Sequence, residues 1–176
     1  YRSHGITRDP DEMTQVEPGP WYYQQITLGY NYRMSELQAA LGISQMKRLA
    51  EFVSIRHAKA ERYNFLLEDL PLQTPYQLDE TYSGLHLYVI QLCLEDISVS
   101  HRDIFENLRA NNISVNLHYI PVHLQPYYRK MGFKNGDFPK AERYYSQAIS
   151  LPMYPGLSEI DQNKVVEVLS MALLKK

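Results

Sequence analysis

The 176-residue sequence predicts an α+β fold, in which helices cover one side of a small antiparallel sheet. Two segments have strand patterns: a continuous apolar and aromatic run at 85–94, and an alternation of apolar and polar residues at 113–119. Helical patterns with serine caps surround both segments, and the first of these patterns is unusually long. The order predicted along the chain is therefore long helix, strand, helix, strand and further helices.

Composition narrows the class of protein. Apolar residues make up 44% and charged residues 22%, which is ordinary for a soluble globular domain. The 18 basic residues nearly balance the 20 acidic ones, so we expect neither nucleic acid nor a membrane surface as a partner. Cys93 is the single cysteine, which excludes an internal disulfide, and we expect it to be buried in a strand. No apolar run approaches the roughly 20 residues that span a bilayer, and no signal peptide is recognisable. We therefore expect a cytoplasmic protein.

Residues 1–34 do not have the pattern of an independent fold. Proline-rich loop sequences at 9–12 and 17–20 show little periodicity, and a short aromatic strand is expected at 21–26. We expect this stretch to be a residual segment of a larger domain. The 15 tyrosines of the chain also favour an oligomer, because tyrosine suits interfaces.

A long helix is predicted next, over 35–70. Ser35 and Gln38 form a capping-box pattern, so the helix should begin at Glu36, and Pro71 should end it. Such a helix would be roughly 50 Å long, which suits a connection between domains. We expect a kink or close packing at Gly42. The candidate core positions are apolar: Leu37, Leu41, Leu49, Phe52, Val53, Leu66 and Leu70.

Residues 71–176 are predicted to form a small α+β domain. The strand at 85–94 is followed by a helix capped by Ser100, the strand at 113–119, and helices near 125–131 and 138–149. Ser158 and Asp161 cap the last helix. His118 falls on the polar face of the second strand.

Asn31 and Arg33 lie just before the capped helix, between tyrosines. A guanidinium group and an amide in this position suit a phosphate or carboxylate, because arginine offers a planar fork of donors. A loop that merely packs on its own domain explains the same residues equally well. The residues alone leave both interpretations open.

Four sequence blocks together resemble the C-terminal part of the DegT/StrS family of sugar aminotransferases. The blocks are RSHG at 2–5, GYNYRMSELQAALG at 29–42, HYIPVH at 118–123 and ISLPMYP at 149–155. The family uses pyridoxal 5'-phosphate to aminate keto groups on nucleotide-linked sugars for polysaccharide biosynthesis. The first two blocks most resemble the members that act at C4 of a UDP-linked 4-keto-6-deoxy-HexNAc in pseudaminic acid biosynthesis.

The resemblance implies how the chain is organised. Residues 1–34 would be a residual segment of the large cofactor domain with a dimer loop, 35–70 a connecting helix, and 71–176 the small domain of a fold-type I aminotransferase. The enzyme would be a homodimer with glutamate as amino donor. None of the eight lysines has the family's setting for the Schiff-base lysine, which is expected upstream of Tyr1. We therefore expect this chain alone not to transaminate.

The resemblance also implies roles for individual residues. Asn31 would reach the cofactor phosphate of the neighbouring subunit, and Arg33 would hold the same loop or meet an anionic group of substrate. His4 would lie near the cleft, and His118 and Tyr119 would contact the sugar or diphosphate.

His123 is expected to join the substrate contacts, although a structural role stays open for it as well as for His4 and His118. A zinc site at His118 and His123 is not predicted, because no nearby Cys, Asp or Glu completes a ligand set. Two other functions stay open for the whole protein. One is a non-catalytic remnant or binding module, and the other is a member that performs dehydration or regulation without the Schiff-base lysine.

Overall fold

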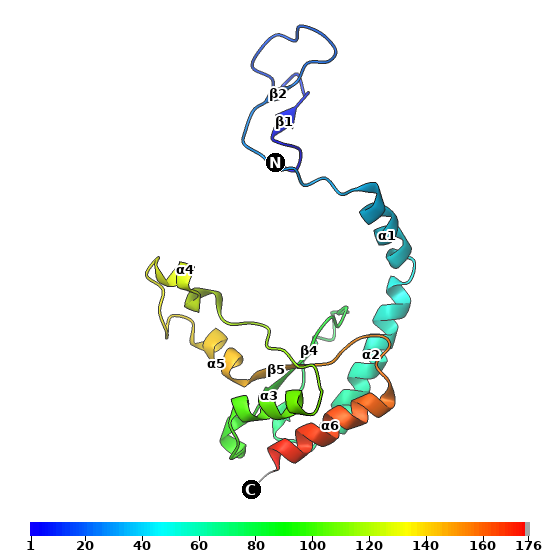
Figure 1. The fold of residues 1–176 in the computed structure, drawn as a ribbon, viewed down its shortest axis with the longest axis vertical. Coiled ribbons are helices and arrows are strands. Elements are labelled where there is room, and N and C mark those ends of the chain that lie inside the picture. Colours follow the sequence, from blue (N-terminus) through cyan, green and yellow to red (C-terminus); the bar gives the residue numbers. More distant parts are fainter. Residues whose placement is uncertain (175–176) are drawn as a thin grey trace. The chain divides into compact units, whose positions relative to one another are not determined.

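The computed structural model describes residues 1–174 and divides into two compact units, Tyr1–Leu49 and Ala50 onward. The first unit contains strands β1 (Ile6–Thr7) and β2 (Gln24–Gln25), which pair antiparallel, and helix α1 (Glu36–Met46) (Figure 1). Gly5 is the one buried residue of this unit. Leu37 and Leu41, predicted to be core positions, are 84% and 64% exposed. The first unit therefore has no apolar core of its own.

The predicted helix over 35–70 is two helices. Its start is confirmed, since Ser35 Oγ accepts a hydrogen bond from the Gln38 amide at 3.3 Å while Ser35 N donates to Gln38 Oε1 at 2.9 Å. The helix breaks after Met46, where the Lys47 and Arg48 amides both donate to the Gln45 carbonyl instead of continuing the helical ladder. Helix α2 (Leu49–Leu66) then ends before Pro71.

Gly42, where a kink or close packing was expected, shows neither. It lies inside α1, and a Cβ atom built on it would meet nothing within 4 Å. The break therefore arises from the turn at Gln45–Arg48 and not from the glycine.

The second unit is built on a three-stranded antiparallel sheet in the order β3–β4–β5, as the fold class predicted. The strands are β3 (Leu72–Gln73), β4 (Tyr88–Leu92) and β5 (Ala148–Leu151). The helix predicted at 138–149 is confirmed as far as Gln147, but its last two residues belong to strand β5, which was not predicted. Helix α5 (Pro139–Gln147) ends at Gln147, and the next four residues pair with the central strand.

The second predicted strand, 113–119, is also wrong as a strand. It makes a single antiparallel bridge, between Asn116 and Ser150. The alternation reports burial correctly at 113–116, where Ile113 and Val115 are buried while Ser114 and Asn116 are exposed. It fails at the end of the segment, since Tyr119 is 71% exposed and His118 is half-buried. Ile113 and Val115 pack in the core, although the segment forms no ladder beyond this single bridge.

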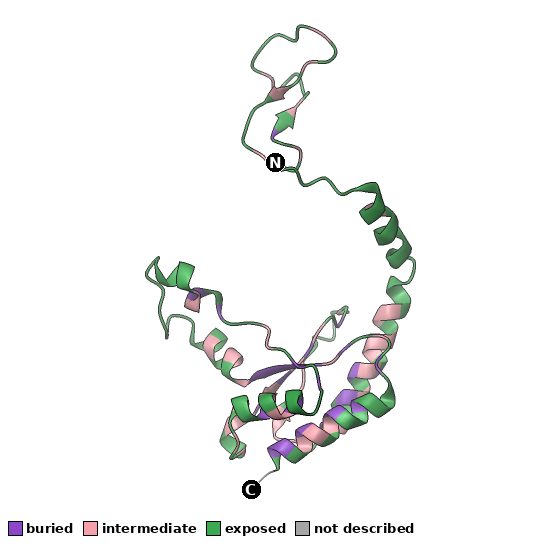
Figure 2. Ribbon diagram, viewed as in Figure 1, coloured by how far each residue is buried: buried purple, intermediate pink, exposed green. Residues whose placement is uncertain are grey.

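The core of this unit lies between the sheet and three helices: α2, α3 (His101–Ala110) and α6 (Glu159–Leu173) (Figure 2). The predicted caps are confirmed, because Ser100 Oγ and Ser158 Oγ accept hydrogen bonds from the amides of Asp103 and Asp161. The most deeply buried side chains are Tyr63, Tyr88, Leu67, Ile90, Leu92, Ile104, Leu108, Ile149, Leu169 and Gln162. Burial raises the pKa values of the Tyr63 and Tyr88 hydroxyls.

Helix α5 leads directly into β5 and borders the sheet at β4. Because Tyr88, Ile90 and Leu92 face the core, Gln91 points to the other face. There it lines a hollow of about 410 Å³ together with Lys140, Arg143, Tyr144 and Gln147 of α5. Cys93 lines the same hollow just after β4 and is half-buried, not fully buried.

Three short helical segments complete the unit: η1 (Leu94–Asp96), η2 (Val122–Leu124) and α4 (Pro126–Arg129). All eight lysines were expected at solvated helix or turn positions, and this is wrong for Lys59, which is half-buried and whose Nζ donates to the Leu157 carbonyl. Lys175 and Lys176 lie outside the described residues. No helix within residues 1–174 combines the length and apolar character needed to cross a bilayer.

Candidate functional site

Ser3 joins two of the sequence blocks in the first unit. Its backbone forms an antiparallel bridge with Asn31, and its hydroxyl accepts a hydrogen bond from Arg33 Nε at 3.0 Å. Since arginine has five donors, this bond leaves the terminal guanidinium nitrogens for an anion. The RSHG block and the GYNYR block therefore form one local structure.

Backbone hydrogen bonds hold these two blocks side by side. The His4 amide donates to Tyr30 O at 2.8 Å, and the Tyr32 amide donates to Arg2 O at 2.9 Å. Gly5 has a φ of +70°, and a Cβ atom at this position would lie 2.1 Å from the Thr27 carbonyl oxygen. Only glycine fits there without a shift, so the close approach of the Thr27 carbonyl explains the glycine of the RSHG block.

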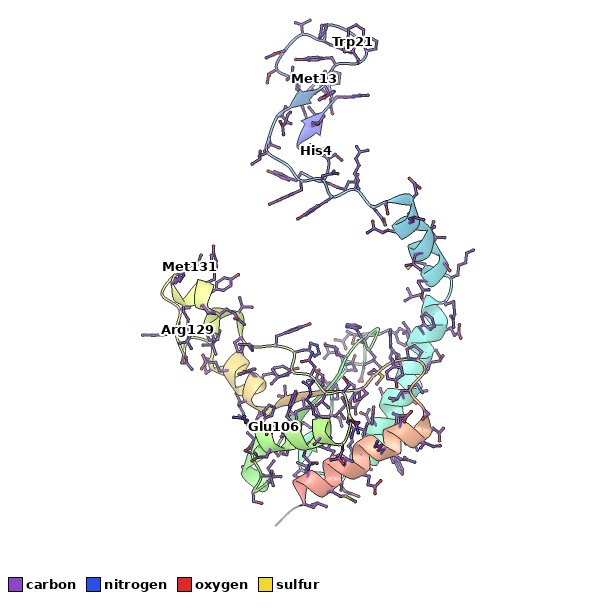
Figure 3. All side chains as sticks on the ribbon, viewed as in Figure 1. His4, Met13, Trp21, Glu106, Arg129 and Met131 are labelled. Carbon is purple, nitrogen blue, oxygen red and sulfur yellow. The ribbon has the colours of Figure 1, made fainter. Side chains whose placement is uncertain are left out.

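A hollow of about 630 Å³ lies beside these segments, and its polar lining includes His4, Arg8 and Arg33. His4 lies next to β1 in this unit (Figure 3). The guanidinium group of Arg8 also lies 6.0 Å from the centre of the Tyr23 ring. Arg8 was not a predicted site residue, because its position in a loop sequence gave no indication of what it would face. Two guanidinium groups and an imidazole make this hollow suitable for an anion.

The groups present fit a phosphate or carboxylate ligand. Asn31 is exposed and lies opposite Ser3, which lines the hollow together with Arg33. Its side-chain amide can donate to a phosphate oxygen. Among the residues that the structure describes, no lysine lines the hollow. The arrangement can bind an anion but supplies no amine for covalent chemistry.

His118 and Tyr119 belong to the second unit. The half-buried His118 ring has its Nδ1 2.7 Å from Ser150 Oγ, and the Tyr119 ring meets it edge-on at a centroid distance of 4.6 Å. Tyr119 itself is 71% exposed. The pair presents an imidazole edge and a phenol at the surface, both of which can hydrogen-bond to sugar or phosphate oxygens.

His123 occupies a different environment from His118. It is only 7% exposed, and its Nε2 lies 2.8 Å from Glu142 Oε1 of α5. The Glu142 carboxylate also accepts a hydrogen bond from the Gly136 amide at 2.8 Å. The hydrogen bond from His123, and then that from Gly136, lower the pKa of Glu142. A ring this buried has little surface left for a substrate, so the contact mainly holds residues 122–142 together.

The predicted site residues thus form two groups. His4, Asn31 and Arg33 come together in the first unit, and His118 lies with Tyr119 in the second. Sequence reasoning missed Ser150 and Glu142, whose partners are 32 and 19 residues away in the chain. Within the described range, no three His, Cys, Asp or Glu side chains gather as metal ligands would.

Comparison with known proteins identifies the relatives of this chain. It is 30% identical over 175 residues to the UDP-4-amino-4,6-dideoxy-N-acetyl-beta-L-altrosamine transaminase of Campylobacter jejuni, covering 99% of this chain and 44% of that protein. Helicobacter pylori PseC, an aminotransferase involved in the biosynthesis of pseudoaminic acid, superposes with a TM-score of 0.81 at 25% identity, covering 98% of this chain and 44% of PseC.

A third relative is the Streptococcus pneumoniae protein Spr1654 in its PMP form, with a TM-score of 0.82 at 26% identity over 97% of this chain and 42% of Spr1654. The chain thus spans about two-fifths of the length of these relatives. The model of the DegT/DnrJ/EryC1/StrS aminotransferase family matches residues 1–170. The resemblance noted from the four sequence blocks is therefore confirmed, and the chain belongs to the DegT/DnrJ/EryC1/StrS aminotransferase family.

Proposed function

We propose that the chain is the C-terminal portion of a pyridoxal 5'-phosphate-dependent aminotransferase that transfers an amino group from glutamate to a keto group of a nucleotide-linked deoxysugar. Family membership over residues 1–170 supports the reaction class. The name of the Campylobacter jejuni relative supports a UDP-linked amino-dideoxysugar as the product class. The PLP and PMP forms of Spr1654 support the cofactor.

The observation that carries the proposal is the double contact of Ser3. The Ser3 hydroxyl accepts a hydrogen bond from Arg33, and the Ser3 backbone lies opposite Asn31 in an antiparallel bridge. The bridge is closed by hydrogen bonds from the His4 and Tyr32 amides, so both candidate anion-binding residues lie on one short, paired segment. The capped start of α1 follows directly and holds that segment in place. Phosphate and carboxylate are the anions that such a pair of donors recognises best.

Pyridoxal phosphate, when bound, carries the amino group from donor to acceptor. In this proposal, the Asn31 amide donates to its phosphate across a homodimer interface. Arg33 offers the terminal nitrogens that Ser3 leaves free to an anionic group of glutamate or of the nucleotide sugar. The lysine that binds the cofactor covalently would lie in a part of the protein that precedes Tyr1, so this chain by itself would be inactive.

The remaining predicted residues contribute to substrate binding. His4 lines the anion-binding hollow, and His118 and Tyr119 donate hydrogen bonds to oxygens of the sugar or the diphosphate. His123 contributes indirectly, through the Glu142 contact that holds its loop. We assign residues 1–34 to the large cofactor domain and dimer loop, 35–70 to the interdomain connection and 71–176 to the small domain. The whole enzyme would work as a cytoplasmic homodimer.

Substitution of Asn31 in the full-length protein tests the cofactor contact. Asn31→Ala should weaken pyridoxal phosphate binding about tenfold, because one hydrogen bond to a charged group is lost. Asn31→Asp should weaken it further, since a carboxylate repels the phosphate. Asn107→Ala, on α3, is the matched control. Equal cofactor affinities for Asn31→Ala and Asn107→Ala would refute the assignment of Asn31.

The reaction itself is tested with the full-length protein, glutamate and UDP-4-keto-6-deoxy-HexNAc, by mass spectrometry of the amino sugar. The 176-residue chain, treated with pyridoxal phosphate and borohydride, should retain no covalent cofactor. A covalent adduct on one lysine of this chain would refute the placement of the catalytic lysine. Cofactor binding by the full-length protein without any amino-sugar product would favour a non-catalytic binding module.

A further inference from the structure

Ser150 is a buried hydroxyl whose partner is a predicted substrate-binding residue. It lies in β5, it is 4% exposed, and its Oγ is 2.7 Å from His118 Nδ1. A buried hydroxyl without a partner is costly, so this contact constrains both side chains. The ring nitrogen that Ser150 does not touch, Nε2, is the one available to a ligand.

The backbone makes the position of Ser150 rigid. Its amide donates to the Asn116 carbonyl at 2.8 Å, and the Asn116 amide donates back to the Ser150 carbonyl at 3.3 Å. Ser150 is also paired with Val89 in the register of β4 and β5. His118 is two residues beyond this bridge, so the strand and the imidazole are linked through both backbone and side chain.

Only one direction of the hydrogen bond between Ser150 Oγ and His118 Nδ1 gives the buried hydroxyl proton an acceptor. In the described part of the chain, His118 Nδ1 is the hydrogen-bond partner of Ser150 Oγ. If Nδ1 carried the proton, the Ser150 O–H would lack an acceptor. If instead the hydroxyl donates to Nδ1, its buried proton is satisfied, and the ring proton lies on Nε2.

We propose that Ser150 is a positioning residue, which donates to His118 Nδ1 and so holds the ring in the tautomer that presents Nε2–H to an oxygen of the nucleotide sugar. The edge-on ring of Tyr119 limits rotation of the imidazole from another side. The role in substrate binding rests on the proposed function, whereas the tautomer is a property of this chain alone. The proton stays on Nε2, so the contact recognises substrate and transfers nothing.

The tautomer is measured on the full chain by imidazole ¹⁵N NMR at pH 8.5, above the ordinary histidine pKa of about 6.5. A His118→Ala variant assigns the signal. We expect the unsubstituted chain to carry the proton on Nε2, and Ser150→Ala to give a mixture of both tautomers. Ser150→Thr, which keeps a hydroxyl, should restore the single tautomer. Ser146→Ala, an exposed serine on α5, is the control and should change nothing.

The proposed contact between His118 and the nucleotide sugar is tested by steady-state kinetics of the full-length enzyme. Ser150→Ala should raise the KM for the nucleotide sugar about tenfold, the value of one hydrogen bond, and leave the KM for glutamate unchanged. An unaltered tautomer in Ser150→Ala, or a proton on Nδ1 in the unsubstituted chain, would overturn the positioning role. A changed tautomer with an unchanged sugar KM would uphold the ring contact and overturn the place of His118 in the proposed function.

Discussion

Replacing Ile149 with alanine should lower the free energy of unfolding of the second unit by about 3–4 kcal/mol. Ile149 is fully buried in β5, and it is paired in register with Ile90 of β4, which is equally buried. The substitution removes three carbon atoms from a packed site, so lost transfer free energy and a residual cavity both contribute. Ile149→Val removes one carbon atom and keeps a β-branched side chain, so it should cost only about 1 kcal/mol.

Urea denaturation followed by far-UV circular dichroism measures these differences, because helices α2, α3 and α6 dominate the signal of this unit. The single tryptophan, Trp21, lies in the other unit, so its fluorescence separates unfolding there from unfolding of the sheet. Ile160→Ala is the matched control, since Ile160 on α6 is 79% exposed and should cost less than about 0.5 kcal/mol.

The losses of unfolding free energy in Ile149→Ala, Ile149→Val and Ile160→Ala together test the position of Ile149 in the core. Equal small losses for Ile149→Ala and Ile160→Ala would refute the position of Ile149 in the core. A loss for Ile149→Val as large as that for Ile149→Ala would show that shape, and not buried volume, controls the site. Ile90→Ala combined with Ile149→Ala should cost less than the sum of the single losses, because the two side chains share one cavity.

Three further predictions concern other parts of the chain. Glu142→Gln should lower the free energy of unfolding at pH 7, because hydrogen bonds from His123 and the Gly136 amide depress the pKa of Glu142 in the folded state. The loss of stability relative to the unsubstituted chain should be complete above the ordinary glutamate pKa of about 4.3 and should vanish as the pH falls through the depressed folded pKa. Denaturation at several pH values measures it. Gly5→Ala should disrupt the pairing around Thr27, seen as faster amide hydrogen exchange in the first unit only; unchanged exchange would contradict the close contact. Ser158→Ala should cost about 1 kcal/mol in urea denaturation, whereas Ser158→Asp, which keeps a capping oxygen, should recover most of it.

Helix starts were predictable from sequence because their determinants are local. The caps at Ser35, Ser100 and Ser158 each involve a partner three residues away, and all three helices begin where the caps place them. The end of the first helix was not predictable in the same way. Its break at Lys47 and Arg48 has neither glycine nor proline to mark it.

The strands were harder to predict because their partners are distant. All four residues of β5 are buried, including Ser150, so the segment lacks the alternation that identifies a half-buried strand. At 113–119 the alternation is present, but only Asn116 finds a ladder partner. Over 113–116 the alternation reports which side chains are buried, although it fails at His118 and Tyr119. Strand pairing depends on a neighbour elsewhere in the chain.

For the candidate site residues, too, local sequence could be predicted but contacts with distant residues could not. The blocks at 2–5 and 29–33 could be recognised by resemblance, yet only the structure shows that Ser3 joins Asn31 and Arg33. Similarly, nothing near His123 in the sequence indicates that Glu142 is its partner. Candidate residues were predictable, and the contacts that orient them were not.

The residues that stabilise the fold and the candidate ligand-binding residues of the first unit lie in different units. The apolar core belongs to the second unit, whereas the first unit buries only Gly5 and carries His4, Asn31 and Arg33. Substitutions at these three residues should leave expression level and melting temperature almost untouched. A screen for folded variants would therefore pass proteins that have lost the proposed anion binding, and only a direct ligand-binding measurement would detect them.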